Sequence, residues 1–391
     1  MPIRDLKDLL TSPDGVHFLA SQDIFVAPED FVTRLQAPVQ AGLTEHLGIE
    51  SQKPVYALQQ VYVDCTQSML DRMALLDCFE PHEDCFPFFL WIDTDLAKTD
   101  ALMLRFVWPL FGKKVSVRLS AGAHDNLELR FVPIEMPRVL QALDKLDVYL
   151  SQSITGRKKV TRAKAKDRYE QLKAVFLQQT SGVLSQLNHR VAYFLLQNQA
   201  GLNPFSVLVS DLIGRDLMTA EINLFLNHLD EAIRVFNDAV QALEAQGIAP
   251  QVKPLAVDYL PLHFSCLGCQ RRLRLSRETQ GNDQFAVASC KCQRQYRFHL
   301  GSHRLSIDDI VHAGPWSPDV SLTLFMNDFV SGYIGGGSSG IYYGLVMKQV
   351  LEKVLHKRRV PILLPQPIGV AGNDPEPVDS LLYRYLMDLT G

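Results

Sequence analysis

Residues 54–63, PVYALQQVYV, and residues 85–92, CFPFFLWI, decide the fold class of this 391-residue chain. Both stretches are apolar and rich in β-branched or aromatic side chains, which predicts two buried strands. Between them, residues 67–76 place apolar side chains at helical spacing and predict a helix. A strand, a helix and a strand of these lengths favour an α/β fold built on a parallel sheet.

Length and composition set limits on the rest of the molecule. At roughly 100–200 residues per domain, a chain of 391 residues suggests two or three domains. Hydrophobic residues make up 47% of the chain and charged residues 21%, so it can bury a sizeable core and is not mainly disordered. The formal net charge of −4 means that nucleic-acid binding would have to come from a local basic patch.

Targeting signals were sought at the N-terminus and along the apolar runs. The first residues, MPIRDLKDLL, lack the apolar core and cleavage site of a secretory signal. No run approaches the roughly 20 apolar residues of a membrane-spanning helix. We therefore expect a cytoplasmic, reduced protein with no membrane partner.

The pattern changes twice along the remaining chain. Further strands are expected early, helices dominate from residue 137 to about residue 247, and a cysteine-containing β segment follows. The expected elements are strands at 114–119 and 128–132, helices at 172–196 and 221–245, a loop at 316–318, a helix at 342–356 and a strand at 361–365.

Four of the seven cysteines have the spacing of a metal site. They are Cys266, Cys269, Cys290 and Cys292, a C-x-x-C pair and a C-x-C pair about twenty residues apart. Two such pairs on opposed β turns supply the four soft ligands that zinc prefers. We predict a structural zinc ion, since four cysteines leave no open position for catalysis. Ordinary thiols are the alternative, as is a site in which His299 or His303 replaces one cysteine.

Basic residues gather at two places, around the cysteines and in a run of seven within residues 157–168. The arginines near the cysteines are Arg271, Arg272, Arg274, Arg277, Arg294 and Arg297. Tyr296 and Phe298 are interleaved with them, and such a mixture can bind a nucleic-acid backbone and stack bases. A solvated surface is the commoner meaning of such charges, so nucleic acid is the less favoured partner.

A glycine-rich stretch, IGGGSSGIYY at 334–343, lies between an apolar segment and a predicted helix. The backbone N–H groups of such a turn and of a helix N-terminus form a natural anion site. The candidate binding residues are Gly335, Gly336, Gly337, Ser338 and Ser339. The stretch has neither the dinucleotide glycine motif nor a Walker loop, so it does not identify a nucleotide. The alternative is a flexible connection in which the serines cap the helix.

Polar residues lie in or directly after the two buried strands. Gln59 and Gln60 lie in the first, and Asp93 and Asp95 follow the second. Because α/β folds bind ligands at the carboxyl ends of their strands, we predict Asp93 and Asp95 as catalytic carboxylates and both glutamines as substrate-binding residues. The carboxylates could instead cap the next helix, and the amides could close loops.

Several stretches, in chain order, resemble one family. These are Leu58-Gln59-Gln60, FFLWIDTD at 88–95, ALEAQGIAPQVKPLAVDYLPL at 242–262, WSPDV at 316–320, GGGSSGIYY at 335–343 and VPILLP at 360–365. The chain is thereby identified as a divergent member of the bacillithiol-biosynthesis cysteine-adding enzyme (cysteine ligase) family, with an added zinc ribbon. Within the glycine stretch, Gly336 and Tyr342 match that family's signature, which makes Tyr342 a further binding residue. Ser339 stands where the family has a glutamate.

This resemblance implies a fold and an activity. The fold would be a Rossmann-like parallel-sheet core with a helical insertion and a small zinc-ribbon module. The expected segments are 1–136 and 305–391 for the two parts of the core, 137–250 for the insertion and 251–304 for the ribbon. The family joins cysteine to the amine of a glucosamine–malate precursor, and its fold has been associated with a nucleotide site, so ATP or ADP is a candidate cofactor.

Three functions are compatible with these patterns. The favoured one is a ligase-like enzyme that condenses an amino acid, such as cysteine, with another amine acceptor in small-molecule biosynthesis. The second is a binding module that uses the ribbon and the basic helices to contact RNA or a protein. The third is an accessory subunit of a biosynthetic complex, or a homo-oligomer, which predicts an exposed apolar patch.

Overall fold

The computed structural model describes most of the chain. The described residues are 6–49, 52–65, 67–79, 84–97, 105–110, 113–120, 124, 126–178, 181–248, 252–319, 326–365 and 380–387. Residues 366–379, which follow the last predicted strand, lie outside the described residues.

A six-stranded parallel sheet with surrounding helices makes this a mixed α/β protein, as the sequence predicted. In order across the sheet, its strands are β1 (Ile24–Phe25), β13 (Ile362–Leu363), β12 (Gly332–Ile334), β2 (Lys53–Gln60), β3 (Cys85–Ile92) and β6 (Phe205–Leu208). The two stretches that decided the fold class form β2 and β3. Strand β12 runs parallel to β2, with Ile334 opposite Ala57, so early and late parts of the chain build one sheet. This arrangement is consistent with a Rossmann-like core.

The chain divides into two compact units. The first unit comprises residues 1–58, 75–90 and 210–370, and the second comprises residues 59–74, 91–209 and 371–391. The division passes within β2 and β3 and separates the expected helical insertion at residue 209. The bounds of these two compact units differ from those of the expected segments, which are 1–136, 137–250, 251–304 and 305–391.

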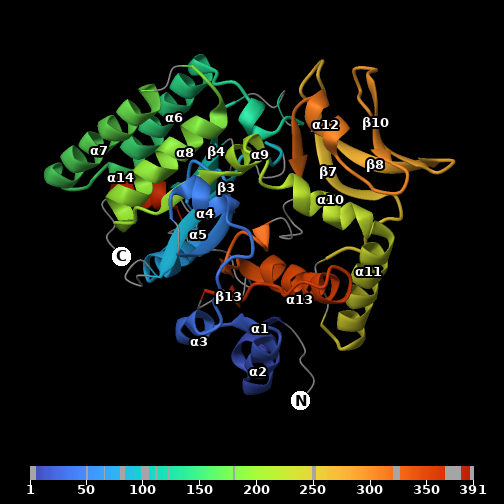
Figure 1. The fold of residues 1–391 in the computed structure, drawn as a ribbon. Coiled ribbons are helices and arrows are strands. Elements are labelled where there is room, and N and C mark those ends of the chain that lie inside the picture. The colour runs from blue at the N-terminus through green and yellow to red at the C-terminus, as the bar shows by residue number, and fades with distance from the viewer. Residues whose placement is uncertain are drawn as a thin grey trace. The chain divides into compact units, whose positions relative to one another are not determined.

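Short and long helices surround the strands of the first unit. They are α1 (Leu6–Thr11), α2 (Pro13–Ser21), α3 (Pro28–Val32), α4 (Gly42–Leu47), α10 (Thr219–Asn227), α11 (Leu229–Ala245), α12 (Asp308–Ala313) and α13 (Gly337–Lys353). Helix α13 packs against α11, as Figure 1 shows, and α2 contacts β1. Helix α13 begins five residues before the predicted start, so most of the glycine-rich stretch is its first turn.

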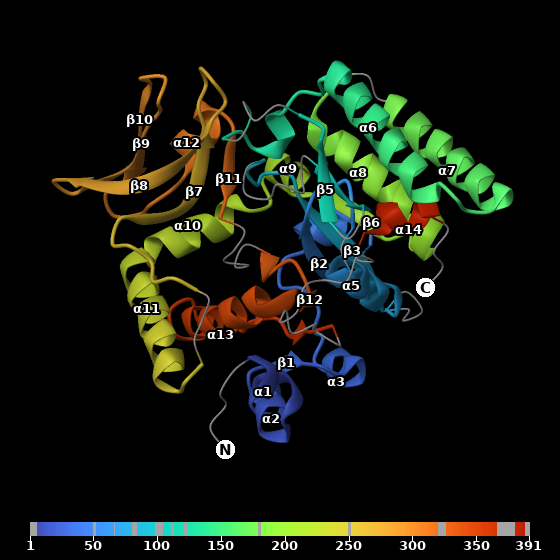
Figure 2. The same cartoon turned by 180° about the vertical axis from the view of Figure 1, so that it is seen from behind.

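The first unit also contains a five-stranded antiparallel sheet, drawn in orange in Figure 2. Its order is β10 (Gln295–Gly301), β9 (Asp283–Ser289), β8 (Arg272–Gln280), β7 (Tyr259–Ser265) and β11 (Trp316–Pro318). The predicted loop at 316–318 is therefore wrong, because Trp316 is buried opposite Phe264 and extends the sheet by one strand.

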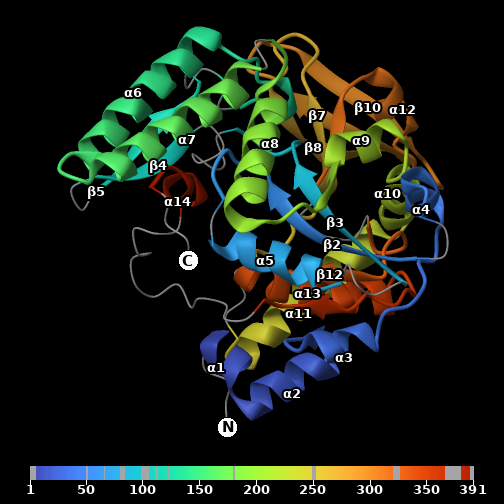
Figure 3. The ribbon, with the colours of Figure 1, turned by 90° about the vertical axis from the view of Figure 1, so that its left-hand side faces the viewer.

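Helices dominate the second unit. Its elements are β4 (Arg105–Leu110), β5 (Lys113–Arg118), the 3-10 helix η2 (Leu129–Phe131), α6 (Met136–Ile154), α7 (Lys159–Leu177), α8 (Leu184–Leu195), the π-helical turn η3 (Leu196–Ala200), β6 and α14 (Leu381–Met387). Figure 3 shows α7 beside α6, with α8 and α14 also contacting α7. Helices α5 (Gln67–Asp77) and α9 (Val209–Gly214) cross the boundary between the units.

Three predicted elements are wrong in their extent or type. Helix 172–196 is interrupted between Leu177 and Leu184, where Gly182 has a φ of +110° that favours glycine. Helix 221–245 is broken at His228, which separates α10 from α11. Residues 128–132 do not form a strand. Leu129–Phe131 are the turn η2, because the N–H groups of Phe131 and Val132 donate to the carbonyls of Glu128 and Leu129.

Within the part of the chain that the structure describes, no helix is both long and apolar enough to cross a membrane.

Candidate metal centre and ligand sites

The four predicted cysteine ligands come together. Their sulfur atoms all lie within 4.8 Å of one another; the residues are Cys266, Cys269, Cys290 and Cys292. The Sγ atoms of Cys266 and Cys292 are 3.5 Å apart, and those of Cys269 and Cys290 are 3.4 Å apart. Disulfide sulfurs would be about 2 Å apart, whereas four sulfurs about 2.3 Å from a central zinc ion would be roughly 3.8 Å apart. The spacing therefore suits a tetrahedral metal site.

Two backbone turns of the same design position these sulfurs. In the first, Gln270 N–H donates to the carbonyl of Cys266, and Gln270 has a φ of +58°. In the second, Gln293 N–H donates to the carbonyl of Cys290, and Gln293 has a φ of +69°. Each turn reverses the chain between two strands, which brings its cysteines to the same end of the sheet. The sequence already contains this repeat, because a Cys-Gln-Arg triplet closes both turns.

Hydrogen bonds around Cys266 favour its thiolate form. Tyr296 Oη donates to its sulfur at 3.1 Å, and the N–H of Gly268 donates to it at 3.4 Å. Burial acts in the opposite direction, but these hydrogen bonds prevail and lower the pKa of Cys266 to about 6. Thiolate is the form that binds metal, so Cys266 is prepared for ligation.

Neither histidine considered as a substitute ligand is part of this cluster. His299 lies on β10, where its ring nitrogen Nε2 is 3.1 Å from an oxygen of Asp283. His303 is exposed in the turn that follows β10. The four thiols suffice for a tetrahedral site, and a histidine is not required.

Most of the ribbon arginines make contacts within the fold. Arg277 pairs with Asp230 at 2.5 Å, and Arg297 pairs with Glu278 while stacking 3.8 Å from the centre of the Phe285 ring. Arg272 bonds to the ring of His263, and the guanidinium of Arg274 lies 5.4 Å from the centre of the Tyr259 ring. These contacts hold four of the six arginines near neighbouring side chains, which weakens the case for a nucleic-acid surface.

A polar network lies where β2 ends. Gln60 Nε2 donates to Asp95 Oδ2 at 2.5 Å, and Tyr62 Oη donates to the amide oxygen of Gln60. Arg72 donates to the amide oxygen of Gln59. The structure thus brings Gln60 and Asp95 together, as the sequence predicted for one site. Sequence reasoning missed Tyr62 and Arg72, although both are polar groups close in sequence to the two glutamines.

Asp93 and Asp95 occupy different environments. Asp93 is only 1% exposed, and its carbonyl accepts a hydrogen bond from the N–H of Arg130. Asp95 is partly exposed, and its second oxygen accepts the N–H of Leu96. Arg130 in turn pairs with the fully buried Glu128 at 2.7 Å. This geometry leaves Asp95, not Asp93, as the carboxylate more accessible to a ligand.

The glycine-rich stretch is tightly packed. A Cβ atom at Gly335 would lie 3.0 Å from Ile362, and one at Gly340 would lie 3.2 Å from the backbone of Gly335. Gly336 is the N-cap residue of α13, and Tyr342 is buried at 5% exposure. Close packing alone therefore accounts for part of the glycine pattern. The stretch belongs to the first unit, whereas Gln60 and Asp95 belong to the second.

Comparison with known proteins found no matching protein-family model and no matching curated protein. The function therefore has to be inferred from the geometry of the chain's own residues.

Proposed function

We propose that the cysteine cluster holds a structural zinc ion and that the antiparallel sheet around it is a zinc ribbon. The observation that supports this proposal is the convergence of four sulfurs within 4.8 Å from two turns of one design. Zinc is the common occupant of tetrahedral four-sulfur sites, and it adds no redox chemistry of its own. The ion would stabilise the end of the sheet without taking part in a reaction.

Metal analysis of the purified full chain tests this proposal. We expect one zinc ion per chain, and we expect Cys266→Ser and Cys292→Ser variants to lose it. Cys78→Ser is the matched control, since Cys78 is an exposed free cysteine outside the cluster. A wild-type chain without zinc, or Cys266→Ser and Cys292→Ser variants that retain it, would contradict the proposal.

We further propose that the α/β core is an enzyme that condenses an amino acid, with cysteine as the first candidate, with an amine acceptor. Its support is the network of Gln60, Tyr62 and Asp95 at the end of a parallel strand, where α/β folds bind ligands. In the proposed role, Asp95 accepts a hydrogen bond from the attacking amine and then its proton. Gln60 holds that carboxylate in place.

The condensation needs an activated acyl group, because a free carboxylate is a poor electrophile. In this proposal the amine nitrogen forms a bond to the acyl carbon, and a phosphate-containing leaving group departs with the electron pair of the broken bond. ATP is the candidate source of that group. This assignment of ATP rests on the sequence resemblance.

Ligand-dependent thermal shift tests the proposed enzyme site. We expect the wild-type chain to be stabilised by one or more of ATP, cysteine and amino sugars, and we expect Asp95→Asn to lose the amine-dependent shift. Asp211→Asn is the control, because Asp211 is an exposed aspartate outside the network. An Asp95→Asn variant that behaves as the wild type toward every ligand would place the site elsewhere.

A binding module remains the second candidate function. It is favoured by Arg271 and Arg294, which lie next to the cysteine turns, and by Leu267, which is 53% exposed in the first turn. An exposed leucine between metal ligands is better suited to a protein partner than to RNA. A wild-type chain that no small ligand stabilises would favour this function.

A further inference from the structure

A pocket in the first unit is distinct from the metal centre and from the Gln60–Asp95 network. It has a volume of about 280 Å³. Its lining residues that matter here are Arg34, Asp328, Ser331, His356, Lys357 and Arg358. Basic residues outnumber the single acid among them, although the chain as a whole is slightly acidic.

One wall of the pocket rests on a buried ionic cluster. Lys357 Nζ lies 2.6 Å from Glu221 Oε2 and 2.5 Å from Asp328 Oδ2, and both carboxylates are 3% exposed. Gln40 donates to the other oxygen of Glu221 at 2.6 Å. Two carboxylates against one ammonium keep Lys357 charged and fix its position, and they more than balance its charge.

The side chain of Asn327 holds the backbone of the same wall through two hydrogen bonds. Asn327 Nδ2 donates to the carbonyl of Arg358 at 3.0 Å, and its Oδ1 accepts the N–H of Val360 at 3.0 Å. His356 has a φ of +53°, a left-handed conformation that is uncommon for histidine. A wall built in this way is ordered before any ligand arrives, which is what a binding site requires.

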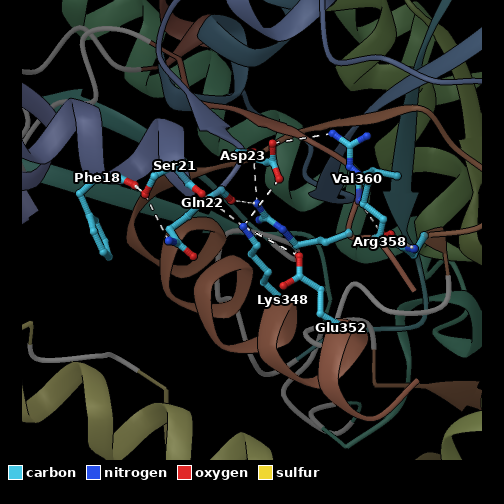
Figure 4. A network of polar contacts seen from close by, with 10 residues as sticks. Phe18, Ser21, Gln22, Asp23, Lys348, Glu352, Arg358 and Val360 are labelled. Carbon is cyan, nitrogen blue, oxygen red and sulfur yellow. Dashed lines mark hydrogen bonds and ion pairs between the residues drawn. The ribbon is translucent and has the colours of Figure 1, made fainter. Parts of the chain in front are cut away.

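Two guanidinium groups supply positive charge that this cluster does not balance. Arg34 is exposed, and its side chain makes no hydrogen bond or ion pair with the described residues. Arg358 is 42% exposed at its side chain and reaches Asp23 only at 3.8 Å. Figure 4 shows Arg358 and Asp23 facing each other. Asp23 is also shared with Lys348, at 3.6 Å, so it does not neutralise Arg358 by itself.

A buried hydroxyl group adds a second indication of a ligand. Ser331 is 2% exposed and lines the pocket, and its Oγ has no hydrogen-bond partner among the described residues. Buried hydroxyl groups are normally hydrogen-bonded, so an unsatisfied one beside a polar pocket points to a missing acceptor.

We propose that this pocket binds the phosphate group of a small anionic metabolite, held by Arg34 and Arg358. Guanidinium groups form bidentate hydrogen bonds with phosphate oxygens, and a phosphate monoester carries a charge of about −1.5 to −2 that two arginines balance. The volume of about 280 Å³ is close to the lower limit of about 300 Å³ for ligand pockets, which suits a small ligand. This site does not depend on the proposed zinc ion or on the proposed condensation.

Isothermal titration of the full chain with inorganic phosphate, at constant ionic strength, tests the proposal. We expect saturable binding that weakens roughly tenfold in Arg34→Gln and in Arg358→Gln, as the loss of a charged hydrogen bond predicts. Arg190→Gln is the matched control, because Arg190 is an exposed arginine on α8. Acetate is the comparison anion, and we expect it to bind more weakly than phosphate.

Three outcomes would overturn the proposal. They are the absence of saturable phosphate binding, unchanged binding in both arginine variants, and an equal loss in Arg190→Gln. Because the side chain of Arg34 makes no hydrogen bond or ion pair with the described residues, Arg34→Gln separates loss of binding from loss of folding. Tighter binding of acetate than of phosphate would contradict the assigned chemistry.

Discussion

The cysteine cluster and the buried ionic cluster of Lys357 are both formed by polar side chains. They differ in how far apart in the sequence their residues lie. Cys266 and Cys292 are 26 positions apart, and each lies in a short turn whose backbone hydrogen bonds set the sulfur in place. Lys357 and Glu221 are 136 positions apart and meet only after separate helices have packed. In our proposal a metal ion holds the local site together, whereas the distant cluster depends on the whole unit being folded.

The largest expected effect comes from removing the proposed metal ion. Structural zinc in small fingers is worth about 10–16 kcal/mol of apparent binding free energy. We expect chelation to release the amides of residues 259–301 to hydrogen exchange, while α6, α7 and α8 remain protected. Hydrogen-exchange mass spectrometry with and without chelator measures both regions. Unchanged protection of the ribbon would mean that its sheet is stable without metal.

The next effect tests the distant cluster. Lys357→Met leaves Glu221 and Asp328 buried without their cation, and breaking a buried pair in this way costs about 3–5 kcal/mol. We expect a value near the lower limit, because the side chain of Lys357 is 20% exposed. Urea unfolding measures the change in free energy.

The control for that variant lies one turn away. Lys353→Met replaces an exposed lysine on α13 and should change the free energy of unfolding by less than about 0.5 kcal/mol. Adding Glu221→Gln to Lys357→Met should restore part of the loss, since it removes one uncompensated charge. A Lys357→Met variant as stable as Lys353→Met would show that the cluster does not hold its unit together.

A smaller effect concerns Asp64, a buried carboxylate in the second unit whose partner is even more distant in sequence. Its Oδ2 accepts from Ser380, 316 positions away, and its Oδ1 accepts the N–H of Leu382. Burial raises the pKa of Asp64 from 3.8 to about 6, against the opposing effect of these hydrogen bonds. The folded chain therefore holds this proton more tightly than the unfolded chain does.

Stability should consequently fall as this proton is lost. The contribution of Asp64 is greatest below about pH 4 and declines as pH rises through about 6. Relative to Asp64→Asn, the wild type should lose about 2–3 kcal/mol of unfolding free energy between pH 4 and pH 7. Urea unfolding of both proteins across that range measures the difference. A difference that does not change with pH would show that Asp64 is already ionised in the fold.

The contrast between local and distant sites also explains what the sequence could predict. The strands at β2 and β3 were evident because each is a continuous apolar run, and the four cysteines because their spacing lies within two turns. Residues 128–132 were misassigned because they alternate like a strand, while the N–H groups of Phe131 and Val132 bond back to Glu128 and Leu129 and close a turn. Lys357, Glu221 and Asp328 carry no local pattern, since only the packed fold brings them within hydrogen-bond distance.

The smallest expected effect comes from Tyr296→Phe. This variant tests whether zinc affinity depends on residues other than the four cysteine ligands. Tyr296 Oη donates to the sulfur of Cys266 and accepts the N–H of Leu267 at 2.8 Å, so it links β10 to the first cysteine turn. Tyr296→Phe keeps the ring that packs 5.0 Å from the ring of Phe264 and removes only the hydroxyl group. We expect zinc to remain at one ion per chain, with an affinity roughly tenfold lower, because groups that orient metal ligands typically contribute at that level.

Competition with a metal chelator measures that affinity, and Tyr149→Phe, which removes a hydroxyl group from α6, is the control. If Tyr296→Phe binds zinc as tightly as the control, the two turns place the four sulfurs without help from the strand. If its affinity falls as expected, the metal site extends beyond the four ligands to β10. In that case the ribbon would share one property with the Lys357 cluster, because part of its geometry would also come from a residue outside its own turns.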